Sequence, residues 1–151
     1  MADWLDIALV FDADRRRADL ALGEDGDLAL DETPATPMLI SFGSDRRARP
    51  DDELPAGTPA PNAFSARRGW AGDALDAQGR LIGSRLWLLE RAKESELTQL
   101  MAAEWTKEAF AWVEPETGAP AEIDVAWVRK SVLGLKVVVD GRAVTLSRTV
   151  A

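Results

Sequence analysis

The stretch from Gly83 to Val113 contains no proline and, after its first residue, no glycine, and it is the longest such stretch in the chain. Apolar residues recur in it every three or four positions, which is the spacing of an amphipathic helix. These positions are Leu86, Leu89, Leu97, Leu100, Met101, Trp105, Ala109, Trp112 and Val113. The stretch also holds three tryptophans, each of which can bury roughly 150 to 250 Å². We therefore expect the rest of the fold to pack around a helical segment with one apolar side.

Ser95 divides this segment into two helices. It interrupts the apolar pattern and is a favourable N-cap residue, so the sequence predicts a short helix over residues 84–92, a kink, and a longer helix over residues 96–113. Glu114 and Pro115 should end the longer helix, because the residue before a proline avoids helical backbone angles.

Three strand-like segments follow the helical region, over residues 122–129, 132–139 and 142–148. An Asp-Gly pair joins the second to the third and is a strong signal for a two-residue hairpin turn. With that turn, Val137 faces Val144 and Leu135 faces Leu146, so both apolar pairs lie on one face of the sheet. The pattern predicts a three-stranded antiparallel meander that packs on the tryptophan-bearing helices. Its last strand should be an open edge, to which another chain can add a strand.

Apolar residues alternate with others over residues 5–11, which predicts a half-buried strand. Residues 20–30 place leucines on either side of a turn at Gly23–Asp27, which predicts a short hairpin. Asp25 and Asp27 in that turn suggest a calcium site. A calcium loop needs about six or seven oxygen ligands at ordered spacing and a bidentate glutamate. This pattern is missing, so we interpret the turn as an acidic loop facing solvent.

A short helix should follow, with Thr36 as its N-cap and Pro37 in its first position. Gly43 should limit it to about two turns. The basic residues Arg46, Arg47 and Arg49 come next. Cations at a helix C-terminus interact favourably with the helix dipole, which explains these arginines without any partner.

Residues 50–66 contain four prolines and no apolar periodicity, which predicts a long, mobile and partly extended loop. Loops of this length inside a domain are often binding elements or become ordered on assembly. Arg67, Arg68 and Trp70 follow directly. One interpretation places a guanidinium over the Trp70 ring. The other, which we favour, is that Trp70 is a structural anchor of the loop.

The composition limits what the chain can do. With 151 residues and 46% hydrophobic content, it is long enough for one domain covering residues 1–151. Its net charge of -8 argues against binding to a nucleic-acid backbone. The absence of cysteine and histidine removes disulfides, thiolate nucleophiles, the usual general base and the commonest metal ligands, so we expect no cofactor and no metal. There is no long apolar run and no basic N-terminus, so we expect a soluble protein made in a cytoplasm, without a membrane partner.

These elements together predict an α+β fold. Its parts are an N-terminal strand or hairpin, a short helix, a long loop, a kinked central helical pair and the C-terminal meander.

Five motifs occur in order along nearly the whole chain. They are Gly-Asp-Leu-Ala at 26–29, Leu-Ile-Ser-Phe at 39–42 with Ser-Asp-Arg-Arg-Ala at 44–48, Arg-Gly-Trp-Ala-Gly-Asp at 68–73, the segment at 83–93, and Glu-Ala-Phe-Ala-Trp at 108–112. In this order they resemble the Mu-like bacteriophage baseplate wedge protein family. The chain departs from that family at Pro34 and Pro37, where the family is more plainly helical, and in its longer proline-rich loop.

More remotely, the chain looks like the small, lysozyme-like wedge component of T-even-like contractile tails and its type VI secretion relative. That group carries a Glu-Pro-Arg motif after its central helix, implicated in wedge assembly. Here Glu114, Pro115 and Glu116 stand in its place, so the arginine is missing. The resemblance therefore implies that Glu114 contacts another wedge protein. It implies no contact through the arginine of the motif, because Glu116 stands in its place.

The resemblance implies a structural, non-enzymatic baseplate wedge protein of a contractile phage tail or tail-like particle, made in the host bacterial cytoplasm. Its expected partners are other wedge proteins and the tail sheath protein, which it would help to nucleate, with several copies in a sixfold symmetric assembly. Our candidate partner-binding residues are Arg46, Arg47, Arg67, Arg68, Trp70, Glu114, Val144 and Leu146. For each charged residue the competing interpretation is a surface charge or an internal ion pair.

The alternative function is a carboxylate-dependent hydrolase of cell-wall glycans. It would need an acid and a base roughly 5 to 9.5 Å apart across a cleft. Glu90 and Glu114 are the candidates for that pair, although nothing in the sequence favours them over other acidic residues. In the assembly interpretation, Arg85 and Glu90 serve the fold.

Overall fold

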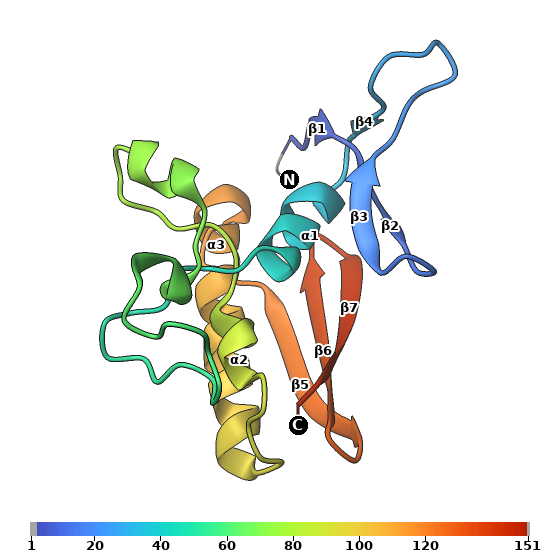
Figure 1. The fold of residues 1–151 in the computed structure, drawn as a ribbon. Coiled ribbons are helices and arrows are strands. Elements are labelled where there is room, and N and C mark those ends of the chain that lie inside the picture. Colours follow the sequence, from blue (N-terminus) through green and yellow to red (C-terminus); the bar gives the residue numbers. More distant parts are fainter. Residues whose placement is uncertain (1–2, 151) are drawn as a thin grey trace.

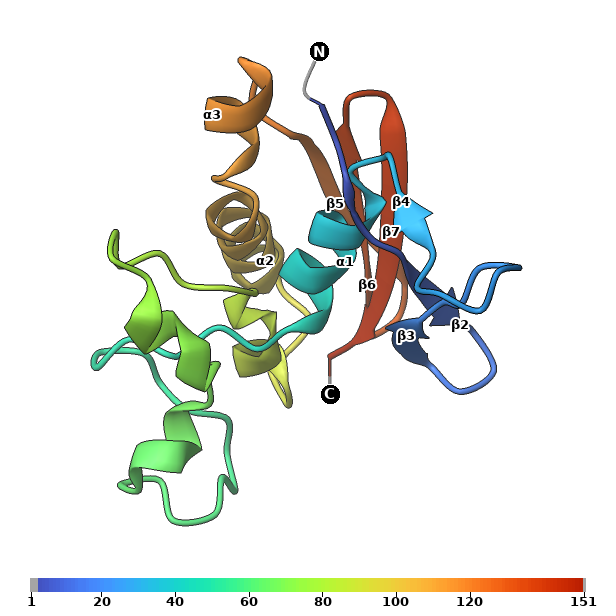
Figure 2. The ribbon, with the colours of Figure 1, turned by 90° about the horizontal axis from the view of Figure 1, so that it is seen from above.

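Helices α1 (Ala35–Gly43) and α2 (Glu96–Ala109) lie on one face of a three-stranded antiparallel sheet (Figure 1; Figure 2). The strands, in their spatial order, are β5 (Glu122–Arg129), β6 (Val132–Val139) and β7 (Arg142–Thr149). The computed structural model describes residues 3–150. The predicted α+β class with its C-terminal meander is confirmed.

The register of the meander agrees with the sequence pattern. Val137 pairs with Val144 and Leu135 pairs with Leu146, as the Asp-Gly turn predicts. Asp140 and the glycine after it both have positive φ angles, of 47° and 76°, as the tightest two-residue hairpin turns require. The core-facing side chains of β6 are fully buried: Leu133, Leu135, Val137 and Val139. They pack with Leu86, Trp87, Phe110 and other residues of the helical region, so the predicted packing of sheet on helices is confirmed.

The helical region differs from its prediction in length and in orientation. The expected first helix is a short 3₁₀ helix, η3 (Arg85–Leu89), whose five residues are all buried. Ser95 is the N-cap of α2, as predicted, and its hydroxyl accepts a hydrogen bond of 3.1 Å from the Thr98 N–H. Leu97 and Leu100, expected on the apolar side, are exposed. Trp105 and Ala109 are buried as predicted, and Thr98, Ala102 and Thr106 complete the buried side.

The predicted end of the long helix is also wrong. Helix α2 stops at Ala109, and α3 (Val113–Thr117) begins after a turn and contains Glu114 and Pro115. Pro115 fits there because it lies in the first turn of a helix, where a backbone N–H needs no helical acceptor.

Helix α1 begins with Pro34 as its N-cap, two residues before the predicted cap. The Thr36 side chain is buried and reaches back to the N-terminal strands: its hydroxyl accepts a 3.1 Å hydrogen bond from the Leu9 N–H and lies 3.0 Å from the Asp31 carboxylate. The helix ends at Gly43, and Ser44 is extended. The last turn therefore contains no arginine, and the helix-dipole explanation of the three arginines is wrong.

The N-terminal residues form short strands: β1 (Asp6–Ile7), β2 (Leu9–Asp12), β3 (Arg17–Leu20) and β4 (Leu30–Asp31). The expected single strand is divided at Ala8, and β2 forms a hairpin with β3 that the sequence did not predict. The turn at Gly23–Asp27 is confirmed by the pairing of Leu22 with Leu28. We call residues 5–31 the N-terminal layer.

The segment from Pro50 to Ile82 contains two short 3₁₀ helices, η1 (Phe64–Arg67) and η2 (Ala71–Leu75), joined by turns. We call it the loop layer. In both views it lies on the opposite side of the two helices from the N-terminal layer (Figure 1; Figure 2). Within the described part of the chain, no helix is long and apolar enough to cross a membrane.

Candidate interaction surface

Glu108, near the end of α2, is the centre of an ion-pair network beneath the loop layer. Its carboxylate accepts hydrogen bonds of 2.8 Å from Arg85 Nε and 2.7 Å from Arg49 Nη2, and it lies 3.5 Å from Arg46 Nη1. Burial alone would raise the pKa of Glu108, but the hydrogen bonds and charges of the arginines outweigh burial and lower it. Glu108 is therefore a fixed negative charge that holds three segments together.

Arg85 connects this network to the proline-rich loop. Its Nη1 donates to both Asp52 carboxylate oxygens, at 2.7 and 2.9 Å, and its guanidinium lies 5.3 Å from the Trp105 ring centroid. Asp52 also accepts a 2.7 Å hydrogen bond from the Arg49 N–H. The first part of the loop is thus tethered to η3 and α2. Our expectation that Arg85 serves the fold agrees with this geometry, while the mobility of residues 50–66 stays a prediction.

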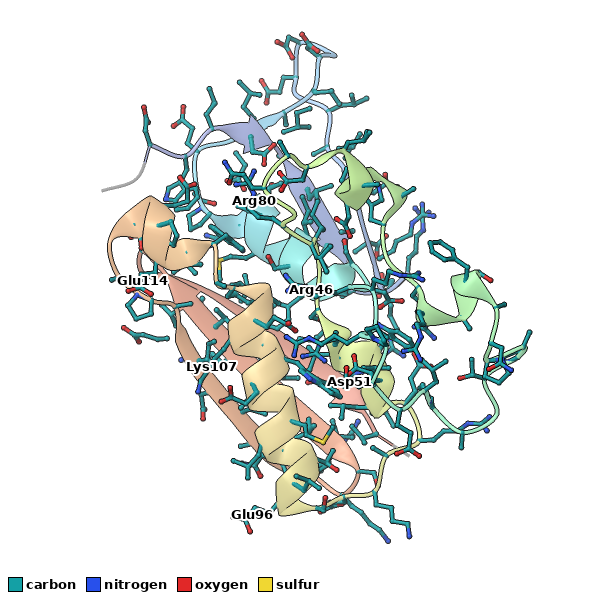
Figure 3. The ribbon with its side chains drawn as sticks, turned by 90° about the vertical axis from the view of Figure 1, so that its left-hand side faces the viewer. Arg46, Asp51, Arg80, Glu96, Lys107 and Glu114 are labelled. Atoms are coloured by element: carbon teal, nitrogen blue, oxygen red, sulfur yellow. The ribbon has the colours of Figure 1, made fainter. Side chains whose placement is uncertain are left out.

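Arg46 and Arg67 were predicted to bind a partner, and the structure places both guanidinium groups on backbone carbonyls. Arg46 donates to Gly83 O at 3.1 Å and to Leu81 O at 2.6 Å. Arg67 donates to Pro50 O at 3.0 Å and also to the Arg49 carbonyl. Figure 3 looks onto this side of the molecule, with Arg46 near its centre. Arg67 thus binds the beginning of the loop layer from within it, and Arg46 binds the end of the layer from outside it.

Arg47 and Arg68 stack on aromatic rings. Arg47 lies 3.8 Å from the Phe64 ring centroid and donates to the Phe64 carbonyl at 3.1 Å. Arg68 lies 4.3 Å from the centroid of Trp87, so it stacks on that ring and not on Trp70, contrary to the interpretation that we did not favour. The Trp70 ring is exposed and lies so close to Gly72 that a Cβ there would overlap it.

Arg68 also organises a second network. It donates to Asp45 at 2.8 Å and to Glu90 at 3.1 Å, and Arg148 from β7 lies 3.5 Å from the same Glu90 carboxylate. This network joins the loop layer, η3 and the C-terminal strand.

A cavity of about 380 Å³ opens between the loop layer and η3. Its lining includes Arg68, Trp87, Glu90 and Arg91, together with loop residues 55–59. Glu114 is not part of it: this residue lies exposed on α3, at the end of α2 opposite Glu96 (Figure 3). The two carboxylates considered for glycan hydrolysis therefore do not line this cavity together.

Glu114 makes no ion pair with any residue in the described part of the chain. The same part contains no cluster of three or more acidic side chains arranged to hold a metal ion, and so none at Asp25 and Asp27.

Strand β7 lies at the edge of its sheet, as predicted, with β6 as its neighbour. Val144 and Leu146 are partly buried and pack against the core. The alternate residues Ala143, Thr145 and Ser147 are exposed. Recognition of this edge would therefore use the backbone of β7 and its small outward side chains, with Val144 and Leu146 fixing the strand in place.

Sequence reasoning missed Glu108, Asp52 and Arg148 as members of the networks. One signal was available in the sequence: Arg85 stands directly before the apolar run from Leu86 to Leu89. The structure buries this whole segment, and a buried charged residue is almost always paired. The identity of its partners could not be read from that signal.

The comparison with protein families places this chain among bacteriophage proteins. The family described as "Phage protein GP46" matches residues 34–145, which extend from the N-cap of α1 into β7, and the chain belongs to this family. It is 40% identical over 99 residues to "Baseplate protein gp46" of Escherichia phage Mu, an alignment that covers 65% of this chain and 61% of the relative. The match thus spans about three fifths of the relative's length. The resemblance to Mu-like baseplate proteins is confirmed, and no solved structure matches significantly.

Proposed function

We propose that this chain is a non-enzymatic structural component of a phage tail baseplate. Its membership of the GP46 family, together with its identity to a baseplate protein of phage Mu, is the observation that carries the proposal. The side chains described above support it, because the charged residues of the candidate surface mainly connect segments of the chain to one another. No geometry in that surface favours the hydrolase alternative.

The more specific proposal is a wedge protein of a contractile tail that helps to nucleate the sheath. Strand β7 supports this role, since its eight residues lie at a sheet edge. Arg142 is its only exposed charged residue, and the exposed side chains that follow, Ala143, Thr145, Ser147 and Thr149, carry no charge. Edge strands of isolated proteins usually carry charges, prolines or bulges that prevent pairing. An edge whose outward side chains beyond Arg142 are small and uncharged is suited to accept a strand from a sheath subunit.

Glu114 is the residue we propose for contact with other wedge proteins. Its carboxylate is exposed on α3 and has no ion-pair partner in the described residues, so it is available to an arginine or lysine of a neighbour. Arg47, Arg68 and Trp70 would contribute at the loop layer. Arg46 and Arg67 would act indirectly, by holding that layer in shape. Several copies would be arranged around the sixfold axis of the baseplate.

The experiment is to express tagged full-length variants in cells that produce the particle, purify the particles, and quantify this chain and the sheath protein by mass spectrometry. The test variant is Ala143→Lys on β7, and its matched control is Ala126→Lys, an exposed alanine on the opposite edge strand β5. We expect the wild type and the control in sheathed particles, and the β7 variant in particles that lack sheath. Absence of the wild-type chain from particles would overturn the baseplate role, and normal sheath with Ala143→Lys would overturn the edge-strand role.

A further inference from the structure

The N-terminal layer presents a continuous apolar face. Leu9 pairs with Leu20 across the β2–β3 hairpin, Ile7 with Leu30, and Leu22 with Leu28. Paired residues share a face of a sheet, and so do residues two apart along a strand. These relations place on one face the side chains Ile7, Leu9, Phe11, Leu20, Leu22, Leu28 and Leu30, which we call the leucine face.

The leucine face is open to solvent except at Leu9, which is half-buried. Leu22 is 72% exposed and Leu30 is 64% exposed, although neither residue carries a polar group that would favour water. Eight of the fifteen exposed large apolar residues of the described chain lie between residues 5 and 30, and six of these eight belong to the leucine face. Such a concentration is unusual for a protein surface and marks an interaction site.

The layer is held in place by the body of the protein. Thr36 and Asp31 bind it to α1 as described, and the Trp4 indole N–H donates a 2.9 Å hydrogen bond to Asp140. The Trp4 ring also meets the Trp112 ring edge to face, at a centroid distance of 5.8 Å. A partner would therefore meet a surface that is already organised, which lowers the entropic cost of binding.

The charge of this region identifies the kind of partner. Residues 3–32 contain ten acidic side chains and three arginines, a net charge of -7, whereas the whole chain carries -8. Several of the acidic residues stand in turns beside the leucine face, including Glu24, Asp25 and Asp27. A second copy of this chain would bring two strongly negative regions together, and nucleic acid would be repelled as well. A basic partner would be attracted.

We propose that the leucine face binds a basic amphipathic helix of another protein. Strands in a sheet are spaced about 4.8 Å apart, so paired strands with their side chains offer a width comparable to a helix of about 10 Å diameter. Leucine-type side chains of the partner would cover the leucine face, and its lysines or arginines would pair with the acidic turns. The layer lies outside residues 34–145 matched by the GP46 family, and the inference does not rest on the proposed baseplate role.

The test uses the full chain and two labelled synthetic peptides of equal length. Both have leucines at helical positions i, i+3, i+4 and i+7; one has lysine at the remaining positions and the other has glutamate. Binding is measured by fluorescence anisotropy at physiological salt, and its location by amide chemical shifts. We expect the lysine peptide to bind at least tenfold more tightly than the glutamate peptide, with shifts concentrated in residues 5–31.

Two sets of variants test the two halves of the proposal. Leu20→Ser combined with Leu22→Ser should lower the affinity for the lysine peptide at least tenfold. The control Leu75→Ser should leave this affinity unchanged, although Leu75 on η2 is 87% exposed. Asp25→Lys combined with Asp27→Lys should also weaken binding and reduce its salt dependence. These acidic residues lie in an exposed turn, so this variant tests the proposal even if the leucine variant loses its fold.

Three results would overturn the inference. The first is equal affinity for the two peptides, and the second is equal weakening by the Leu75 control. The third is a dimer of the chain, seen by sedimentation, that Leu20→Ser with Leu22→Ser abolishes, because the occupant would then be a second copy.

Discussion

Arg85 and Glu108 form a largely buried ion pair, with Arg85 Nε 2.8 Å from Glu108 Oε2 and the arginine side chain only 7% exposed. Arg85 belongs to η3 and Glu108 to α2, and Asp52 joins them from the proline-rich loop. The pair therefore links the helical core to the loop layer. Its position suggests that the shape of the candidate surface depends on buried charges more than on exposed ones.

Removing Arg85 should destabilise the protein strongly. Arg85→Ala leaves Glu108 and Asp52 without their central partner, and breaking a buried pair costs about 3 to 5 kcal/mol in free energy of unfolding. The control is Arg80→Ala, because Arg80 pairs with Asp76 at the surface with 69% of its side chain exposed, and solvent screens such a pair, so its loss should change the free energy of unfolding little. Urea denaturation measures both, and equal losses would contradict a special role for Arg85.

Acid should weaken the Glu108 network. The pKa of Glu108 in the folded protein is lower than its ordinary value of 4.5, because the arginines outweigh the effect of burial. A group with a depressed folded pKa stabilises the protein above its ordinary pKa, and this stabilisation is lost as the pH falls through the folded pKa. The wild type should therefore be more stable than Glu108→Gln at pH 7, and the difference should shrink below about pH 4.5. A pH-independent difference would show that the carboxylate charge is not responsible.

Gly83 should not tolerate a side chain. Its φ angle is 86°, and a Cβ there would overlap the carbonyl oxygen of Ser44, which accepts a 2.9 Å hydrogen bond from the Ser84 N–H. Gly83→Ala should lower the free energy of unfolding by about 3 kcal/mol, from backbone strain plus overlap. Gly118→Ala is the matched control, because Gly118 has a φ of 79° in open space and should lose only about 1 kcal/mol. Equal losses in thermal or urea unfolding would exclude the overlap as a cause.

The chain should not hydrolyse cell-wall glycan. Glu90 is paired with Arg68 and Arg148, and Glu114 lies outside the cavity that Glu90 lines, so these two carboxylates do not form an acid–base pair across it. Purified wild type, Glu90→Gln and Glu114→Gln should all leave the turbidity of a peptidoglycan suspension unchanged. Clearing by the wild type that either substitution abolishes would restore the hydrolase interpretation.

Part of the candidate site was predictable and part was not. The edge position of β7 followed from the order of the strands in the meander, and the sequence analysis assigned Arg85 to the fold without predicting its partners. The aromatic partner of Arg68 could not be predicted from the sequence. The tryptophan nearest to it in the sequence is Trp70, but its guanidinium stacks on Trp87. Arg68 has a φ of 50°, a conformation that sequence reasoning does not anticipate for arginine.

By itself, the sequence determined the features that depend on neighbouring residues. Alternation and one Asp-Gly turn were enough to establish the register of Val137 with Val144, and Ser95 was enough to start α2. Its motifs also identified the family. Only the tertiary structure decided which side of α2 is buried and which carboxylate each arginine meets. A helical pattern is compatible with several buried faces, and an arginine can reach many acidic residues, so both choices depend on contacts between segments far apart in the chain.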